Sequence, residues 1–373
     1  MARWLLPDNI SDVLPEEARR VERLRRALLD LYRGYGYELV IPPLIEHLDS
    51  LLTGTGHDLD LATFKIIDQT SGRSLGLRAD ATPQAARIDA HILNRTGVVR
   101  LCYAGSTLHA RARHPLASRE PIQVGAELYG DAGVDADLEV LELAVRSARV
   151  AGAGSVLIDL GHTGVLRAVL AGDPAAGAHV EDILTALNAK DPAALAAALG
   201  PLNAATRRAL QELAALHGGP EVIAHARRCL PAHPALVAAL DELARLAERC
   251  EAEQVSVDLA DLHGFRYHTG ATFAAYVERL PGPLLRGGRY DDIGRAFGRA
   301  RPATGFSILD LREAALLAAP APASAIRAPH DGDPALTARV AELRAAGEIV
   351  VRAGSAAGPD GALTFDRELR RVG

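Results

Sequence analysis

The segment His263-Gly264-Phe265-Arg266-Tyr267-His268-Thr269-Gly270 is the most informative stretch of this 373-residue sequence. It follows a run of strand character at 255–259, and glycine-punctuated strand patterns continue after it to about residue 309. A second polar segment of this region is Arg286-Gly287-Gly288-Arg289-Tyr290-Asp291. Paired glycines in a strand usually mark only a bulge or a tight turn. The function of the region therefore has to be inferred together with the segments that precede it.

The residues before this region predict helices mixed with hairpin-linked strands. Val21, Leu24, Leu28 and Leu31 recur at helical spacing, and Thr82 is expected to cap a later helix. A Thr-Ser-Gly turn between two apolar runs predicts a hairpin. The expected helices cover 15–31, 83–93 and 137–151. A turn followed by a strand is expected over 35–46, and further strands are expected over 64–68, 75–78, 98–103 and 122–129. This mixture predicts an α+β fold with an antiparallel sheet flanked by helices, not repeated βαβ units.

The composition changes abruptly between about 164 and 250. Alanine and leucine dominate there, strand patterns vanish, and Gly-Pro or Asp-Pro breaks separate helical stretches, which predicts a helical insertion. A proline-rich segment at 320–322 predicts a linker. The expected organisation is a core over 1–319 that contains the insertion, followed by a short strand–helix–strand unit over 326–373.

Composition and charge narrow the classes of function. The net charge of −6 and the absence of a basic stripe in the sequence argue against a nucleic-acid platform, including one for tRNA. The three cysteines match no zinc spacing and predict reduced thiols in a cytoplasmic protein. The most apolar late stretch is broken by charges and prolines, so no membrane span is expected. Neither a metal site nor a cofactor is predicted.

Several segments occur in the order found in histidyl-tRNA synthetases, which have the class II aminoacyl-tRNA synthetase fold. Residues 263–270 resemble their Arg-Gly-Leu-Asp-Tyr-Tyr-Thr-Gly signature, and residues 286–291 resemble Ala-Gly-Gly-Arg-Tyr-Asp. The other similar segments are 35–46, 77–82, 103–127 and 305–312, which correspond to the first class II motif, a Leu-Arg-Pro-Glu-Gly-Thr segment, and the second and third motifs. The resemblance spans roughly residues 5 to 312 and implies a class II synthetase-like core that self-associates as a dimer.

The residues that such enzymes need for amino-acid activation have changed. Activation brings a carboxylate against a phosphate, so fixed cations must stabilise the developing charge. Where the family has an arginine beside the reacting carboxylate, this chain has His263, and histidine is mostly uncharged near neutral pH. Counting back from Gln123, the ATP-contacting arginine and the following acid are replaced by His109 and Arg111, while Arg312 remains. Adenylate formation is therefore not expected.

The ligand-holding residues are better retained. The resemblance assigns Asp80 and Thr82 to the α-ammonium group of histidine, and the four-residue spacing of Gln123 and Glu127 places both on one face of a strand. A single glutamate on an alternating strand is usually solvated, but the ordered set of motifs favours a pocket. The candidate histidine-binding residues are Asp80, Thr82, Gln123, Glu127, His263, Tyr267, His268 and Tyr290.

One family combines these departures, the regulatory subunits of ATP phosphoribosyltransferase, and the chain resembles it along its whole length. The resemblance implies no catalysis by the chain itself and a hetero-oligomer with the short-form catalytic subunit. It also implies activation of that subunit and histidine feedback in the first step of histidine biosynthesis. The alternative is a divergent histidyl-tRNA synthetase. The tail of fewer than fifty residues, which carries seven arginines and seven acidic residues, argues against a tRNA-binding domain.

Overall fold

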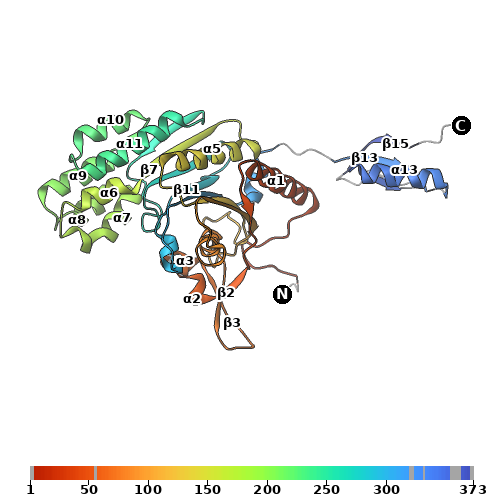
Figure 1. Ribbon diagram of the computed structural model, residues 1–373, viewed down its shortest axis with the longest axis horizontal. Coiled ribbons are helices and arrows are strands. Elements are labelled where there is room, and N and C mark those ends of the chain that lie inside the picture. Colours follow the sequence, from red (N-terminus) through yellow and green to blue (C-terminus); the bar gives the residue numbers. More distant parts are fainter. Residues whose placement is uncertain (1–3, 54–56, 319–322, 331, 353–362, 370–373) are drawn as a thin grey trace. The chain divides into compact units, whose positions relative to one another are not determined.

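The computed structural model describes residues 4–53, 57–318, 323–330, 332–352 and 363–369. The chain divides into two compact units (Figure 1). The larger unit comprises Met1–Asp12 with Val21–Ala318, and the smaller comprises Val13–Arg20 with Ala319–Gly373.

A nine-stranded sheet formed by described residues lies at the centre of the larger unit, with strand order β1-β5-β6-β12-β11-β10-β7-β9-β8. From β5 to β7 every neighbouring pair is antiparallel, whereas β1 pairs with β5 and β9 pairs with β7 in parallel. The strands are β1 (Glu38–Leu39), β5 (Val99–Ser106), β6 (Ile122–Tyr129), β7 (Val156–His162), β8 (His217–Gly218), β9 (Gln254–Asp258), β10 (Ala271–Val277), β11 (Leu285–Arg289) and β12 (Ala303–Ile308).

One face of this sheet packs against helix α5 (Val134–Val150), which contacts β6, β7, β10, β11 and β12. Ala126 and Leu128 of β6 belong to the same hydrophobic core as Leu28 and Tyr32 of α1 (Pro15–Gly34). Side chains alternate between the two faces of a strand. Gln123, Gly125 and Glu127 therefore lie on the opposite face, which we call the front face.

The region 163–249 forms a layer of helices beside β7 and β9, gathered at one end of the larger unit in Figure 1. His162 joins this layer to the sheet. Its Nδ1 accepts a hydrogen bond from the amide of Gly164 at 3.0 Å, and its Nε2 lies 3.1 Å from Glu242. The elements are α6 (Thr163–Leu170), η2 (Ala176–His179), α7 (Val180–Asn188), α8 (Pro192–Ala198), α9 (Ala204–Ala214), α10 (Glu221–Cys229) and α11 (Pro234–Arg249).

A small antiparallel sheet, with strand order β2-β4-β3, precedes helix α4 (Thr82–Arg87) in the sequence. This helix continues into a π-helical turn, η1 (Ile88–Leu93). The remaining elements of the larger unit are β2 (Ile45–His47), α2 (Leu48–Leu51), α3 (His57–Ala62), β3 (Phe64–Ile67), β4 (Ser74–Leu77), η3 (Ile293–Phe297) and α12 (Leu311–Ala314).

The smaller unit contains a three-stranded parallel sheet of described residues, with order β14-β13-β15. Ile326, Ala328, Val340 and Val350 form its core. Its elements are β13 (Ala323–Ala328), α13 (Pro334–Ala345), β14 (Val350–Arg352) and β15 (Leu363–Glu368).

The α+β class, the hairpin and the main helices are confirmed, but three expectations need correction. Thr82 does not cap the helix with its side chain, because its hydroxyl lies 2.9 Å from the hydroxyl of Tyr103. The helical region contains one short strand, β8, which pairs with β9. The C-terminal unit has a further strand, β15, which the sequence pattern did not reveal.

The sheet is tied to α5 by a buried ion pair that gives a test of the fold. Arg289 is 5% exposed, and its Nε and Nη2 donate to the carboxylate of Asp137 at 3.0 and 2.9 Å. We expect Arg289→Met to lower the free energy of unfolding by about 3–5 kcal/mol, because Asp137 would remain as an uncompensated buried charge. Chemical denaturation measures this change, with the exposed Arg295→Met as control. A loss no larger than that of the control would contradict the assignment.

Candidate functional site

The carboxyl group of Glu127 lies buried on the front face of the sheet, with the residue only 1% exposed. The hydroxyl of Tyr103 on β5 donates to its Oε1 at 3.0 Å. The hydroxyl of Tyr290, directly after β11, donates to its Oε2. Among the described residues Glu127 has no ion-pair partner. Two phenols, not a cation, therefore fix the position of this carboxyl group.

Burial raises the pKa of Glu127 to about 8, and the hydrogen bonds from Tyr290 and Tyr103 offset only part of this effect. Near pH 7 the side chain is consequently mostly protonated. A protonated carboxyl can donate to a neutral ring nitrogen, and a carboxylate can accept from a protonated ring. The site is thus suited to a group that shares one proton with it.

A polar network lies beside Glu127 on the same face. The Nε2 of Gln123 donates to Asp80 at 2.8 Å and to the hydroxyl of Ser307 at 3.0 Å. The amide of Ala81 donates to the Oε1 of Gln123 at 2.9 Å, and the amide of Thr82 donates to Asp80 at 2.9 Å. Asp80 is a half-buried acid held in a fixed orientation, so it can accept hydrogen bonds from an ammonium group.

The floor of the site is made of glycines. Glu127 pairs with Gly305, and Gly305 pairs with Gly288 across three neighbouring strands. A Cβ at Gly125 would collide with the ring of Tyr103, and one at Gly305 would collide with the carboxyl of Glu127. Glycine is therefore required at these positions, because the side chains of Tyr103 and Glu127 lie directly against the backbone of the sheet.

Tyr267 completes the aromatic part of the site. Its ring stacks on that of Tyr290, with centroids 5.0 Å apart and planes at 27°. Its hydroxyl is buried and has no hydrogen-bond partner among the described residues. A buried hydroxyl without a partner is costly, so this group is available to a polar ligand.

His268 packs against Tyr267 edge to face, with ring centroids 5.3 Å apart. Its Nδ1 lies 3.1 Å from the carbonyl of Gly264. Burial lowers the pKa of His268 to about 4, so the ring is neutral near pH 7 and its Nδ1 donates to that carbonyl. His268 therefore contributes shape and a neutral ring, not a charge.

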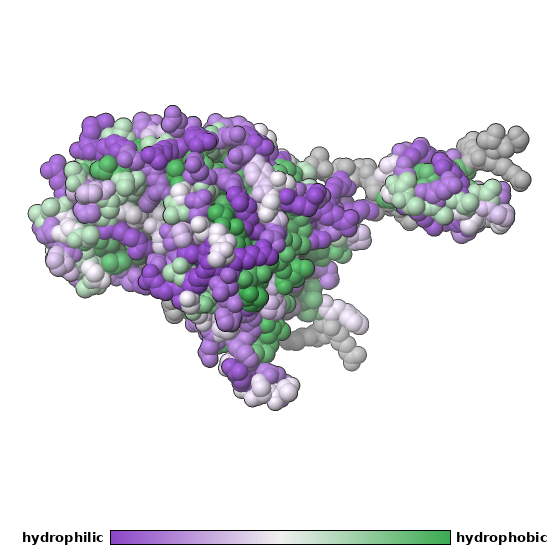
Figure 2. All heavy atoms as spheres, viewed as in Figure 1, coloured by the Kyte–Doolittle hydropathy of each residue, from purple (hydrophilic) through white to green (hydrophobic). Residues whose placement is uncertain are grey.

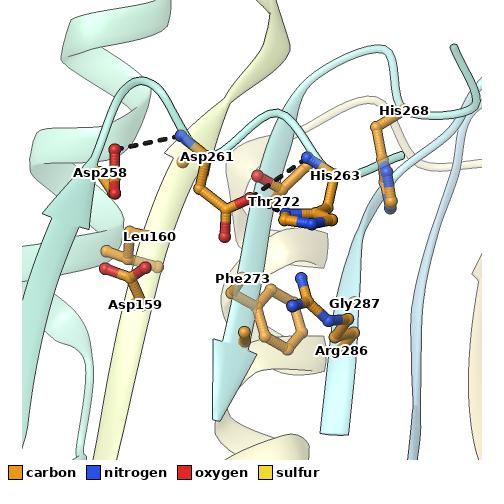
Figure 3. Close-up of a pocket in the computed structure, with 12 residues that line it drawn as sticks. Asp159, Leu160, Asp258, Asp261, His263, His268, Thr272, Phe273, Arg286 and Gly287 are labelled. Atoms are coloured by element: carbon orange, nitrogen blue, oxygen red, sulfur yellow. Dashed lines mark hydrogen bonds and ion pairs between the residues drawn. The ribbon is translucent and has the colours of Figure 1, made fainter. Parts of the chain in front are cut away.

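His263 lies apart from the Glu127 network. It is exposed, and its Nδ1 contacts the carboxylate of Asp261. Both residues line a hollow of about 40 Å³ that also includes Asp159 and Arg286 (Figure 3). His263 is thus engaged with an acid on its own loop and makes no contact with Glu127.

His109 stands where the sequence comparison placed the loss of a cation. Its Nε2 donates to the carbonyl of Ala79 at 2.9 Å. Burial lowers its pKa, and the hydrogen bond to Ala79 offsets only part of that effect. The ring is therefore neutral near pH 7 and cannot stabilise a phosphate as an arginine would.

The structure brings most of the candidate residues together. Seven of them form one contiguous cluster on the front face, and His263 lies apart; the seven are Asp80, Thr82, Gln123, Glu127, Tyr267, His268 and Tyr290. Sequence reasoning missed Tyr103 and Ser307, which position the cluster. Tyr103 pairs with Gly125 and Ser307 also pairs with Gly125, so the strand register could have identified both only once the pairing was known.

Comparison with known proteins identifies the family of the chain. Residues 9–313 match the family model described as histidyl-tRNA synthetase, and residues 323–373 match that of the ATP phosphoribosyltransferase subunit HisZ C-terminal domain. The ATP phosphoribosyltransferase regulatory subunit of Ralstonia pickettii is 57% identical over 94% of this chain and 90% of its own. That of Cupriavidus metallidurans is 56% identical over 100% of this chain and 97% of its own.

The chain belongs to the family of ATP phosphoribosyltransferase regulatory subunits. A solved structure supports the fold. It is described as an ATP phosphoribosyltransferase regulatory subunit/histidyl-tRNA synthetase from Bacillus halodurans, with a TM-score of 0.84, 27% identity and 98% coverage of each chain. The resemblance noted in the sequence and the class II synthetase-like fold are therefore confirmed. Family membership makes the chain a regulatory, non-catalytic subunit.

Two absences concern the described residues. No helix among them is both long and apolar enough to cross a membrane. No group of three or more histidine, cysteine, aspartate or glutamate side chains in the same residues could hold a metal ion.

The raised pKa of Glu127 predicts how its replacement affects stability with pH. The folded chain holds this proton up to about pH 8, whereas the unfolded chain releases it near the ordinary value of 4.5, so Glu127 costs stability increasingly as the pH rises between the two. We expect Glu127→Gln to raise the melting temperature, with a larger gain at about pH 8.5 than at about pH 5. Thermal unfolding at both pH values measures this, and an equal effect at both would contradict the assignment.

Proposed function

We propose that this chain activates a short-form ATP phosphoribosyltransferase catalytic subunit, and that the Glu127 cluster is the histidine sensor for feedback in the first step of histidine biosynthesis. The observation that carries the proposal is the buried Glu127 carboxyl, held by Tyr103 and Tyr290 beside the Asp80–Gln123 network. A cytoplasmic location suits such a subunit, and the cysteines among the described residues are free thiols.

The chemistry of free histidine matches this arrangement. Its imidazole can share a proton with Glu127, whose pKa of about 8 lies above neutral pH. Its ammonium group can donate to Asp80 and to the side-chain oxygen of Gln123. The hydroxyl of Tyr267, which has no partner among the described residues, can form a further hydrogen bond with the ligand.

Regulation requires that histidine binds with different affinity to two states of the complex. A ligand shifts an equilibrium only by its differential affinity, and the coupling between two sites is reciprocal. Binding of the catalytic subunit must therefore alter the affinity of the Glu127 cluster for histidine by the same factor by which histidine alters the affinity between the subunits.

The first test mixes the purified chain with a short-form catalytic subunit. Transferase activity should rise, and histidine should inhibit the mixture. We expect Glu127→Ala to abolish histidine inhibition while activation remains, because the imidazole loses its partner. The exposed Glu248→Ala on α11 serves as a matched control and should retain both effects.

Unchanged inhibition by the Glu127→Ala variant would move the sensor elsewhere. No activation by the wild-type chain would overturn the regulatory role itself. Robust histidine-dependent ATP–pyrophosphate exchange by the chain alone would instead establish the alternative, a histidyl-tRNA synthetase, which is the family whose model matches residues 9–313.

Self-association as a dimer is also part of the proposal. The edge strand β1 and the segment that follows expose apolar side chains, with Leu39 48%, Ile41 82% and Ile45 44% exposed. Figure 2 shows hydrophobic surface around β2, which contains Ile45. Exposed apolar groups of this kind, gathered along one edge, are typical of an interface.

We expect Ile41→Arg to shift the chain from dimer to monomer, because it places a charge within the apolar surface. Analytical ultracentrifugation measures the mass in solution. The control is Val237→Arg, a partly exposed apolar residue of the helical layer. A dimer that persists in Ile41→Arg, or a wild-type monomer, would contradict the proposed interface.

A further inference from the structure

Arg286 is a cation on the floor of the front face, and the known family signature does not predict it. It stands at the first position of the segment 286–291, where the histidyl-tRNA synthetase signature has alanine. It lies on β11, paired with Ser307 of β12 and Ala274 of β10. Its guanidinium forms no hydrogen bond or ion pair with any described residue. Figure 3 shows its guanidinium extending into the hollow below His263.

The strand register places Arg286 next to the Asp80 end of the Glu127 cluster. Ser307, its partner on β12, accepts a hydrogen bond from Gln123 at 3.0 Å, and Gln123 donates to Asp80 at 2.8 Å. Neighbouring strands lie about 4.8 Å apart, and paired residues share a face. By register, Arg286 is therefore one strand away from the network that would hold an ammonium group, and its guanidinium extends into the neighbouring hollow.

Three polar groups thus surround the glycine floor. The carboxyl of Glu127 lies in one row of the sheet with Gly305 and Gly288, and Arg286 lies in the adjacent row beside Ser307. A Cβ at Gly288 would approach the carbonyl of Ala271 to 2.6 Å, so no side chain can stand on that floor between them. The carboxyl of Glu127 complements an imidazole, the carboxylate of Asp80 complements an ammonium group, and the guanidinium of Arg286 complements a carboxylate.

The acids near Arg286 each bond to another group, although Asp261 also feels the charge of Arg286. Asp159 accepts a hydrogen bond from the hydroxyl of Ser256 at 2.6 Å, and Asp261 is engaged by His263. Asp258 pairs with Lys190 at 2.6 Å. His268, which faces the same hollow, is a neutral ring near pH 7 and does not compete for an anion. A half-buried guanidinium without a hydrogen-bond partner among the described residues is suited to binding a carboxylate.

We propose that Arg286 binds the carboxylate of the amino-acid ligand whose ammonium group lies at Asp80 and Gln123 and whose imidazole reaches Glu127. This inference rests on the proposed histidine site and names the residue that distinguishes an α-amino acid from an amine. It also gives a physical reason why the site tolerates His263 in place of an arginine, because a different strand supplies the positive charge.

The test compares two ligands that differ only in the carboxylate, L-histidine and histamine. Isothermal titration calorimetry on the full-length chain measures both affinities for the wild type, Arg286→Ala and Arg286→Lys. We expect Arg286→Ala to weaken L-histidine by about 10- to 100-fold, the range for losing a hydrogen bond to a charged group, and to leave histamine unchanged. Arg286→Lys should recover part of the histidine affinity. The exposed Arg245→Ala on α11 is the matched control and should bind as the wild type does.

The outcomes separate the inference from the proposed function. If the wild type binds L-histidine but Arg286→Ala binds it equally well, the carboxylate anchor is wrong and the histidine site stands. Equal losses for L-histidine and histamine, in a variant with unchanged thermal unfolding, also overturn the anchor. If the wild type binds no L-histidine, the proposed histidine site itself is wrong. A selective loss for L-histidine that lysine partly restores supports the inference.

Discussion

The site depends on one interaction, the contact of the buried Glu127 carboxyl with the hydroxyls of Tyr103 and Tyr290. These three side chains come from β5, β6 and the end of β11, so their meeting requires the strand order of the central sheet. It also requires the glycines at 125 and 305, because a Cβ at either position would occupy the space of these side chains. Both the packing of the strands and the formation of the site therefore require glycine at positions 125 and 305.

The electrostatics of the front face explain why the scaffold of a synthetase serves here in regulation. Activation chemistry needs fixed cations around a phosphate, yet His109 is a neutral ring bound to the carbonyl of Ala79 and His263 is engaged by Asp261. The part that we propose to hold an amino acid instead keeps its hydrogen bonds, from Asp80 through Gln123 to Ser307. A chain of this family can thus recognise a ligand without the groups that would activate it.

Much of this could be predicted from the sequence, and the limits have physical causes. Alternation along 122–129 placed Gln123 and Glu127 on one face, as the structure has them. The local sequence pattern predicts that Thr82 caps a helix, but the long-range contact with Tyr103 determines the orientation of its side chain. Ser307 and Arg286 join the site through strand pairing, which no local pattern reveals. The strand β15 was missed because it lies apart in sequence from the strand with which it pairs.

The most direct measurement for the central claim is a crystal structure of the full-length chain grown with saturating L-histidine. The account predicts the ligand on the glycine floor of the front face, with an imidazole nitrogen within about 2.7–3.2 Å of the Glu127 carboxyl and the ammonium group at Asp80. Histidine bound elsewhere on the chain, or a Glu127 cluster that binds none at saturation, would contradict it.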